Sequence, residues 1–560
     1  MVKQHTSVHD HVLTFSARQK KIAIIVVATA FVMDLLDSTI VNIAIPSIQT
    51  NLHASFASIQ WLIAGYLLAF ATFLITGGRM GDVFGYKKIF MIGVGGFTVA
   101  SLLSGLAWSP EILIFTRILQ GASAAMMVPQ VMSTMQIMYK PSERGMINGI
   151  FGALGGLAAS LGPVIGGLLI QANLFNLDWR PIFFINVPVG IVALILASRY
   201  LPEGKSPHPL KLDIIGTVLV VLALSLLVYP LIQGRELDWP IWTFVMLGSA
   251  IPVLLLFIWS QRLKDRKDHS ALVQPSLFKV KAFGAGLSIN LLFEIAIAGF
   301  FLTFALFTQI GLGFSVIHAA LTGLPISIGI TLTMVLFGSK IPKLGRRAIM
   351  YGTAVMCLGF SILTWSIFII GIGINSWQIA PGLVVTGVGM GLLFGALYST
   401  VLNGVDTKHA GSASGTLNAV QQVGAAIGIA VIGVIYFGQL SSGSTAHFDS
   451  VVPRLHTEFA TLGLPDSTQT AIISSAKTCF VDRAHEKDSS IIPTSCQTLS
   501  DFPGLSSAVT SIVTTSVKDA NAINFQHAFR WAVVFEVGFV LLCFALAFLL
   551  PKEFNHDKVV

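Results

Sequence analysis

Apolar segments of bilayer-spanning length recur along the whole chain, and this repetition constrains the fold more than any other feature. A transmembrane helix needs about 20 consecutive, mostly apolar residues. Fourteen segments meet this length: 22–45, 59–78, 89–108, 111–138, 145–171, 181–201, 213–233, 241–260, 284–307, 317–338, 348–371, 378–402, 413–437 and 529–550. Because backbone in lipid must satisfy its own hydrogen bonds, we expect an all-α polytopic membrane protein with these 14 transmembrane helices.

The composition agrees with this class and excludes several others. Hydrophobic residues make up 54% of the chain and charged residues 11%, whereas about a quarter of a soluble domain is charged. The 4 cysteines form no close metal-ligand cluster, and the sequence contains no phosphate-binding Gly-x-x-x-x-Gly-Lys-Ser/Thr loop. The histidines have no metal-binding spacing inside a span. We therefore expect a protein that is not an enzyme and that needs no metal or cofactor.

Successive connecting segments lie on opposite sides of the membrane, and lysine and arginine are distributed unequally between the two sides. Nearly all of them lie on the side that also holds the N-terminal segment 1–21 and the tail 551–560. The short loops on the other side hold only Arg180 and Arg235. Basic residues mark the cytoplasmic loops of membrane proteins. We expect a multi-pass protein of the cell (plasma) membrane with both termini in the cytoplasm. The net charge of +8 then reflects topology rather than binding to nucleic acid.

Two carboxylates lie near the middle of the first predicted span. Asp34 and Asp37 are three residues apart, so they share one face of a helix. A charge at the centre of a spanning helix costs about 2.5–3.5 kcal/mol, and such residues normally face a cavity, a partner or a proton path. We expect this pair to bind protons or substrate, and the alternative is that both acids only pair with a buried arginine.

Further ionisable residues lie at membrane depth in other spans. Arg117 lies within span four, where we expect it to pair with Asp34 or Asp37 if spans one and four adjoin; a purely structural pair is the alternative. Glu294 lies near the middle of span nine and is predicted to bring a carboxylate to the central cavity from the second half of the chain. Glu536 is shallower, and either reaches the outer interface or joins these buried groups.

The segment after span two has a distinctive pattern of glycine and charge. It reads Gly77-Gly78-Arg79-Met80-Gly81-Asp82-Val83-Phe84-Gly85-Tyr86-Lys87-Lys88. We interpret it as a membrane-surface loop in which glycines permit tight turns and Asp82 meets helix N-termini or the basic residues around it. Gly78, Arg79, Asp82 and Gly85 would then form a latch that is made in one conformation and broken in another. The alternative is a solvated turn. A related pattern without the acid follows span ten, at 338–347.

The two related loops predict an internal repeat, as many transporters have. Spans one to six would form an N-terminal six-helix half at 22–201, and spans nine to fourteen a C-terminal six-helix half at 284–550. Spans seven and eight form a two-helix insert with a basic cytoplasmic linker, at 202–283. The polar segment 438–527 then forms an external loop, with short helices over the outer mouth. Its Cys479 and Cys496 form either a disulfide or two free thiols.

Several motifs, in their order along the chain, resemble those of the major facilitator superfamily, and in particular its fourteen-span drug:proton antiporter family. The motifs are Leu36-Asp37-Ser38-Thr39-Ile40-Val41-Asn42-Ile43-Ala44-Ile45-Pro46, the 78–88 segment, Arg117-Ile118-Leu119-Gln120-Gly121, Gly162-Pro163-Val164-Ile165-Gly166-Gly167, Trp179-Arg180-Pro181-Ile182-Phe183-Phe184-Ile185-Asn186-Val187-Pro188, Gly411-Ser412-Ala413-Ser414-Gly415 and Gln421-Gln422-Val423-Gly424. Their co-occurrence is far more specific than any one of them. The resemblance covers the membrane part and leaves 438–527 unmatched.

The resemblance implies roles for particular residues. It implies that Asp37 handles protons or cations, that Arg117 is the family's fourth-span arginine, and that Gly162, Pro163, Gly166 and Gly167 form the motif that marks exporters. Small residues also let a membrane helix pack closely against a neighbour, which is a generic alternative for these glycines.

The function implied is proton-coupled efflux (antiport) of lipophilic, cationic drugs or toxic compounds by alternating access. Its partners would be such substrates, protons and the lipid bilayer, and the protein would be a monomer. One alternative is a dedicated exporter of one metabolite, antibiotic, siderophore or lipid; a proton-coupled importer is another. A membrane-embedded enzyme or sensor would need a catalytic constellation or a signalling domain, which the sequence lacks.

Overall fold

The structure is a computed structural model that describes residues 16–139, 141–206, 211–268, 270–338, 340–402, 405, 410–486, 492–500 and 506–551. Most of the predicted N-terminal segment 1–21 and of the tail 551–560 therefore lies outside the described residues. Within the described residues the chain is helical, and 14 helices are long and apolar enough to cross a membrane. This confirms the predicted fold class.

The spanning helices follow the predicted segments one for one. They are α1 (Ala17–Leu52), α2 (Phe56–Phe84), α3 (Tyr86–Gly105), α4 (Pro110–Met138), α5 (Pro141–Ala172), α6 (Pro181–Phe184) with α7 (Asn186–Tyr200), α8 (Ile214–Glu236), α9 (Ile241–Asp268), α10 (Lys281–Leu306), α11 (Val316–Phe337), α13 (Arg346–Ile370), α14 (Ser376–Leu402), α15 (Ala410–Asp449) and α19 (Ser507–Ala547). Shorter elements connect them: η1 (Leu174–Asn176), η2 (Pro275–Lys279), η3 (Phe307–Gly311), α12 (Ile341–Leu344), η4 (Gly371–Gly373), α16 (Val452–Thr461), α17 (Asp466–His485) and α18 (Thr494–Ser500).

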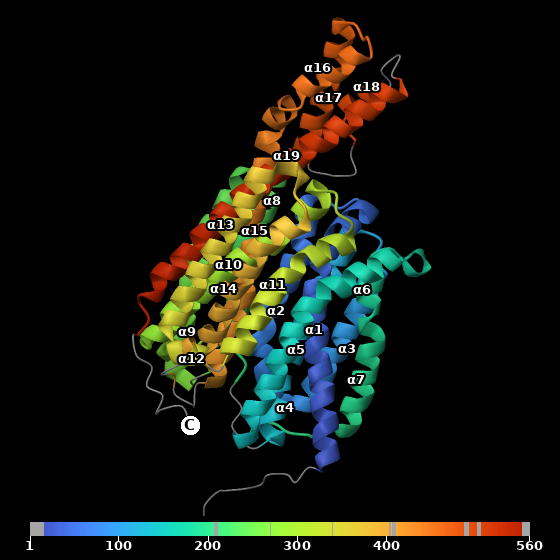
Figure 1. The fold of residues 1–560 in the computed structure, drawn as a ribbon. Coiled ribbons are helices and arrows are strands. Elements are labelled where there is room, and N and C mark those ends of the chain that lie inside the picture. Colours follow the sequence, from blue (N-terminus) through green and yellow to red (C-terminus); the bar gives the residue numbers. More distant parts are fainter. Residues whose placement is uncertain are drawn as a thin grey trace, which may run out of the picture.

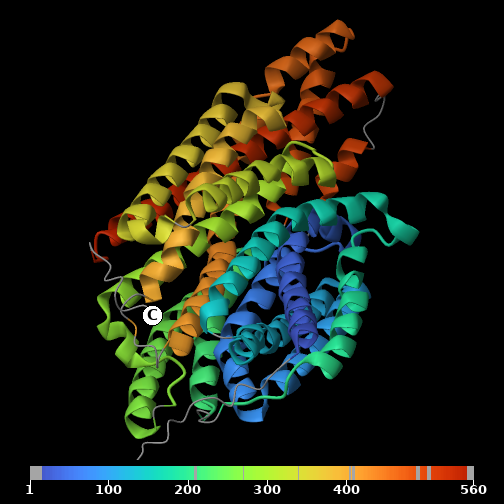
Figure 2. The same cartoon turned by 60° about the horizontal axis from the view of Figure 1, so that its bottom comes forward.

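The helices form two groups that lie side by side (Figures 1 and 2). Helices α1 to α7 make the N-terminal group, and α10, α11, α13, α14, α15 and α19 make the C-terminal group. Helix α1 begins, and α19 ends, at the lower end of the molecule in Figure 1, which we name the terminal end; the opposite end is the distal end. Helix α8 packs against both groups, touching α2 and α15.

Side-chain contacts hold the two groups together at the distal end. Gln60, near the distal start of α2, donates from Nε2 to the carbonyl of Ile429 in α15 at 2.8 Å. The rings of Phe56 and Phe437, from the same two helices, lie 4.3 Å apart. Gln309 of η3 donates to the carbonyl of Ile43 in α1 at 3.2 Å. The structure is therefore closed between the groups at its distal end.

The segment 438–527 differs from the predicted external loop. Helix α15 continues to Asp449, and α19 already begins at Ser507, so both extend well beyond the predicted spans. With α16 to α18 they form a projection that extends beyond the distal end of the helix groups (Figure 1). Buried Phe448, Phe459 and Phe480 give the projection a hydrophobic core of its own. Cys479 and Cys496 form a disulfide, which decides between the two alternatives.

Candidate functional site

The carboxylate of Asp37 is the centre of a buried polar cluster in the N-terminal group. Only 1% of Asp37 is exposed. Arg117 of α4 donates from Nη1 to Oδ2 of Asp37 at 2.5 Å, and both side chains are buried. Gln120 of α4 and Asn186 of α7 each donate to Oδ1 at 2.8 Å. One carboxylate thus joins three helices, and three donors compensate its removal from water.

Asp34 lies one helical turn before Asp37 and has a different partner. The hydroxyl of Tyr66, in α2, donates a hydrogen bond to Oδ1 of Asp34. The guanidinium of Arg117 lies over the ring of Tyr66, 4.3 Å from its centroid, so the two acids belong to one network. The sequence left open which acid pairs with Arg117; in the structure it is Asp37.

The network includes two residues that we did not assign from the sequence. Gln120 is three residues after Arg117 on the same helical face. Its Oε1 accepts a hydrogen bond from Nη1 of Arg117 at 2.6 Å. Asn186 begins α7 directly after the break at Ile185. Both residues lie in the motifs quoted above, and a polar side chain within an apolar span was the available signal.

A cavity of about 70 Å³ borders the Asp37 carboxylate. Its lining is apolar except for Asp37 and Asn186, and it includes Met33, Leu36, Ile165 and Val189. The structure therefore leaves a small, mostly apolar space next to Asp37.

Glu294 forms a separate site in the C-terminal group. It lies in α10 with 9% of its surface exposed, and Gln421 of α15 donates to Oε1 at 2.8 Å. Among the described residues, no hydrogen bond or ion pair connects Glu294 with Asp34, Asp37 or Arg117. The two halves thus each hold a buried carboxylate, in two clusters and not in one.

Glu536 belongs to the buried groups, which decides between the two alternatives for this residue. Its side chain is fully buried within the C-terminal group, with 0% exposed. Neither carboxylate oxygen has a hydrogen-bond partner among the described residues.

The segment after span two is helical, which corrects the predicted loop. Helix α2 continues to Phe84, and Gly85, at a φ of 102°, is the turn before α3. A side chain is strained at this φ, so glycine is needed there. Gly78 faces Pro129 of α4, where an added Cβ would lie 3.5 Å from the proline Cβ. Arg79 is only 6% exposed, which excludes the solvated turn as its setting.

The side chains of Arg79 and Asp82 have different partners. Arg79 donates to the carbonyls of Lys211, at 3.1 Å, Ser270, at 2.6 Å, and Ala271. Asp82 accepts a hydrogen bond from the Tyr86 hydroxyl at 2.9 Å. Arg79 therefore attaches α2 to the connection that follows α9, outside the N-terminal group.

Asp213 organises the same connection, and sequence reasoning missed it. It is the N-cap of α8, where it accepts from the amide of Gly216 at 2.9 Å. It also accepts from Gln261 at 2.8 Å, from Lys264 at 3.1 Å and from the amide of Leu272 at 3.2 Å. An acid just before an apolar run is an N-cap signal, but its contacts with the 261–272 region are visible only in the fold.

The glycines of the expected exporter motif lie at two helix interfaces. Gly162 packs against Thr39 of α1, and Gly166 against Ile40, so α5 approaches α1 closely beside Asp37. Gly167 faces α11 of the other group: an added Cβ would lie 3.1 Å from Cα of Ile317 and 3.5 Å from Cβ of Ala320. Pro163 lies inside α5. The motif thus contributes to the closed distal end.

Comparison with known proteins places this arrangement in a family. The model of the Major Facilitator Superfamily matches residues 27–429. A relative in Streptomyces coelicolor, described as a probable actinorhodin transporter, is 39% identical over 534 residues, which is 95% of this chain and 92% of the relative. The tetracenomycin C resistance and export protein of Streptomyces glaucescens is 33% identical over 421 residues, 74% of this chain and 75% of that protein.

Solved structures show the same fold. A bacterial homologue of the human lysosomal transporter Spinster, in an inward-facing and occupied conformation, aligns with a TM-score of 0.57 and 16% identity, over 98% of this chain and 100% of that one. With its 14 apolar helices the protein is a multi-pass membrane protein. The chain belongs to the Major Facilitator Superfamily, in which it is of the drug-efflux type.

Proposed function

We propose that this protein is a proton-coupled efflux transporter that exports lipophilic, cationic drugs or toxic compounds by alternating access. The single observation that carries the coupling is the buried cluster of Asp37, Arg117, Gln120 and Asn186. The relatives support the export of antibiotic-like compounds, since their names describe transport of actinorhodin and export of tetracenomycin C.

The chemistry of Asp37 suggests how a proton changes the conformation. The charged carboxylate accepts hydrogen bonds from three side chains on α4 and α7. A protonated carboxyl becomes a donor at one oxygen, so it no longer satisfies all three, and the charge of Arg117 loses its counter-ion. The cluster must then rearrange, and with it the packing of α1 against α4 and α7.

Substrate and proton compete in this scheme, and the competition couples their movements. A cationic substrate is stabilised by deprotonated carboxylates at Asp34 or Glu294, and protonation from the outside releases it. Each elementary charge that moves inward through the membrane potential contributes about 2.3 kcal/mol per 100 mV. That free energy drives accumulation of the substrate outside.

Under the proposed orientation, the distal closure lies on the outer side of the membrane. With both termini in the cytoplasm, the distal end faces outward, and Gln60, Gln309 and Gly167 close the outer side. We assign Gly78, Arg79, Asp82 and Gly85 to the conformational latch on the cytoplasmic side, where Arg79 donates hydrogen bonds to the carbonyls of Ser270 and Ala271.

We further propose that 22–201 and 284–550 move as two halves in one monomer, with 202–283 as the insert.

A dedicated exporter of one compound is the second candidate. The relative in Streptomyces coelicolor with 39% identity bears the name of a transporter for one antibiotic, whereas the multidrug resistance protein Stp of Mycobacterium tuberculosis is 28% identical over 439 residues. A panel of lipophilic cations and aromatic antibiotics separates the two candidates, because only a multidrug transporter moves chemically unrelated members.

The test is transport in proteoliposomes with an imposed pH gradient, with ethidium and the panel as substrates. We expect wild type to move substrate against its gradient and Asp37→Asn to lose gradient-driven transport while it still binds substrate. Asp238→Asn is the matched control, because Asp238 is exposed in the turn after α8 and has a φ of 57°, which asparagine tolerates. Coupled transport by Asp37→Asn would contradict the role of Asp37, and no response of wild type to the gradient would contradict the function.

A further inference from the structure

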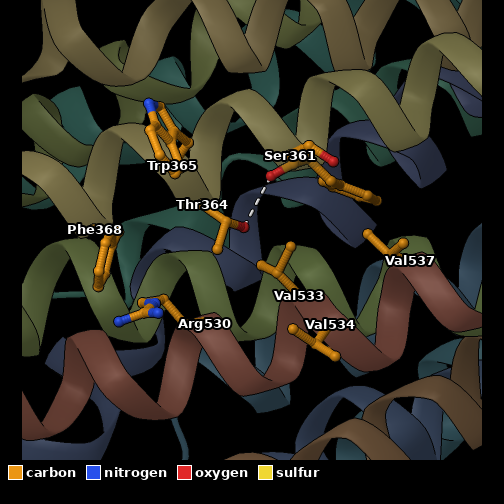
Figure 3. Close-up of a pocket in the computed structure, with 9 residues that line it drawn as sticks. Ser361, Thr364, Trp365, Phe368, Arg530, Val533, Val534 and Val537 are labelled. Atoms are coloured by element: carbon orange, nitrogen blue, oxygen red, sulfur yellow. Dashed lines mark hydrogen bonds between the residues drawn. The ribbon is translucent and has the colours of Figure 1, made fainter.

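An apolar groove lies between α13 and α19 on the lateral surface of the C-terminal group. It has a volume of about 420 Å³, and Figure 3 shows its lining side chains. One wall consists of Phe360, Ser361, Thr364, Trp365 and Phe368 of α13, and the other of Arg530, Val533, Val534 and Val537 of α19. Trp365 and Phe368 are more than half exposed, so the groove opens to the surroundings of the protein.

The polar groups of the α13 wall already have partners. The Ser361 hydroxyl donates to the carbonyl of Cys357 at 2.8 Å. The Thr364 hydroxyl donates to the carbonyl of Phe360 at 2.8 Å (Figure 3). Neither hydroxyl needs a ligand. The valines of the other wall have no polar side-chain atom. Along most of its length, therefore, the groove suits a hydrocarbon chain.

Arg530 is the exception, and it lies at one end of the groove. Its guanidinium lies over the ring of Phe368, 4.7 Å from the centroid (Figure 3). Among the described residues it forms no ion pair, and its buried Nε has no hydrogen-bond partner. A guanidinium presents several donors in one plane and binds phosphate or carboxylate with two of them. The groove therefore joins an apolar channel to an unpaired cation.

The two helices place this cation at a definite depth. Helices α13 and α19 are antiparallel: at the terminal end Arg346 donates to the carbonyls of Phe548 and Leu550 at 3.4 and 3.3 Å. Phe368 is 22 residues after Arg346, which at 1.5 Å per residue corresponds to about 33 Å along the helix axis. The hydrocarbon core of a bilayer is about 30 Å thick. Arg530, beside Phe368, therefore lies at the distal hydrocarbon boundary.

Aromatic side chains support this depth. Trp365, in the groove, and Trp531, next to Arg530, are 65% and 43% exposed. Exposed tryptophans gather at the level of the lipid headgroups, where the indole ring is partly apolar and partly hydrated. The phosphate of a lipid in the distal leaflet thus lies at the level of the guanidinium, and its acyl chains extend toward the terminal end, along the valines.

We propose that the α13–α19 groove is a binding site for one anionic phospholipid of the distal leaflet. Its phosphate binds Arg530, and one acyl chain fills the groove between Val533, Val534 and Val537 on one side and Phe360 and Thr364 on the other. The site is separate from the Asp37 cluster, which belongs to the other helix group. The proposal is independent of the transported compound and of proton coupling.

Native mass spectrometry of the purified full chain tests this assignment. The protein is equilibrated with vesicles of phosphatidylglycerol and phosphatidylcholine in equal amounts, transferred to detergent, and the retained lipid is identified. We expect wild type to retain phosphatidylglycerol in preference to phosphatidylcholine. In Arg530→Gln the retained phosphatidylglycerol should fall by about tenfold, because a charge-assisted interaction with phosphate is lost. Arg530→Lys should retain more lipid than Arg530→Gln.

Two further variants make the result specific to the groove. Lys518→Gln removes the same charge from an exposed position of α19, and should retain lipid like wild type. Val534→Trp fills the groove but keeps Arg530, and should also lose lipid. Equal retention of both lipids by wild type, or equal loss from Arg530→Gln and Lys518→Gln, would overturn the proposal. A third outcome would also overturn it: the protein retains no phosphatidylglycerol but binds oleate, and this binding depends on Arg530. The groove would then bind a soluble amphiphile.

Discussion

Arg117 and Asp37 form a buried ion pair between α4 and α1, with 2.5 Å between Nη1 and Oδ2. Each side chain is at most 1% exposed. Taking such a pair out of water is costly, and loss of one partner leaves an uncompensated charge in a setting of low polarity. The pair therefore stabilises the packing of α4 against α1 only while both groups are charged.

The energetic coupling of this pair can be measured. We expect Asp37→Asn and Arg117→Gln each to lower the stability of the purified protein by about 3–5 kcal/mol, because each leaves one buried charge unpaired. The double variant should lose much less than the sum of the two, since no charge remains. Thermal unfolding in detergent, followed by tryptophan fluorescence, gives the order of the three Tm values. Strictly additive losses would contradict a direct interaction.

The contact between Gly167 and Ala320 predicts a cross-link that locks the distal end. A Cβ added at Gly167 would lie 3.5 Å from Cβ of Ala320, and disulfides have Cβ–Cβ distances of about 3.5–4.5 Å. The variant Gly167→Cys/Ala320→Cys should therefore form a disulfide under mild oxidation, and export should stop until reductant is added. Peptide mass mapping without reduction identifies the bond.

The controls for this experiment are the variants Gly167→Cys and Ala320→Cys alone and the wild-type protein. They carry the native Cys479–Cys496 disulfide and the free Cys357 and Cys543, so any effect of oxidant or reductant on those groups is common to all. Full export by the cross-linked protein would mean that the distal ends of α5 and α11 need not separate during transport.

Asp213 gives a stability prediction with a defined pH dependence. Burial acts to raise the pKa of Asp213, but hydrogen bonds from Gln261, from the amide of Gly216 and from Lys264 outweigh it and hold that pKa below its ordinary value. The unfolded-state pKa is about 3.9. The stabilisation is thus complete above that value and is lost as the pH falls through the lower, folded-state pKa.

We therefore expect Asp213→Asn to lower the free energy of unfolding by about 1–3 kcal/mol at neutral pH, because it weakens hydrogen bonds to a buried charge. The difference from wild type should stay constant between about pH 5 and pH 8 and shrink in stronger acid. Tm values measured across this range and on into stronger acid test the expectation, with Asp238→Asn as the exposed control. A difference that grows with acidity would be inconsistent with the lowered pKa.

Glu536 should respond to neutralisation in the opposite way from Asp37. It is fully buried, and among the described residues its oxygens have no hydrogen-bond partner. An unpaired buried charge is costly, so a neutral side chain of the same shape fits this position. Glu536→Gln should unfold at the same temperature as wild type or a higher one, and retain transport. If transport is lost while the Tm is kept, Glu536 exchanges protons during the cycle.

The membrane architecture was predictable from the sequence because its signal is local. Each span is a continuous apolar run, and the bilayer requires the same length of every one, so the fourteen predicted segments match the helices found. Asp34, Asp37, Arg117 and Glu294 were also identifiable, since an ionisable residue within such a run stands out. The resemblance to the family rested on motifs that are likewise short and continuous.

Helix ends beyond the bilayer were not predictable in this way. Outside the membrane a helix can continue through polar sequence, as α15 does to Asp449 and α19 does from Ser507, and hydropathy no longer marks its end. The projection and its disulfide depend on how α16 to α18 pack against these extensions.

The sequence by itself determined which residues are costly to bury, and only the tertiary structure decided which of them meet. Asp37 and Arg117 are 80 residues apart, and Asp37 and Asn186 are 149 apart, so their pairing depends on how α1, α4 and α7 pack. The same holds for Arg79, whose partners at 270 and 271 are on another part of the chain. Buried polar groups must find partners, but the order of helices in space sets which partners they find.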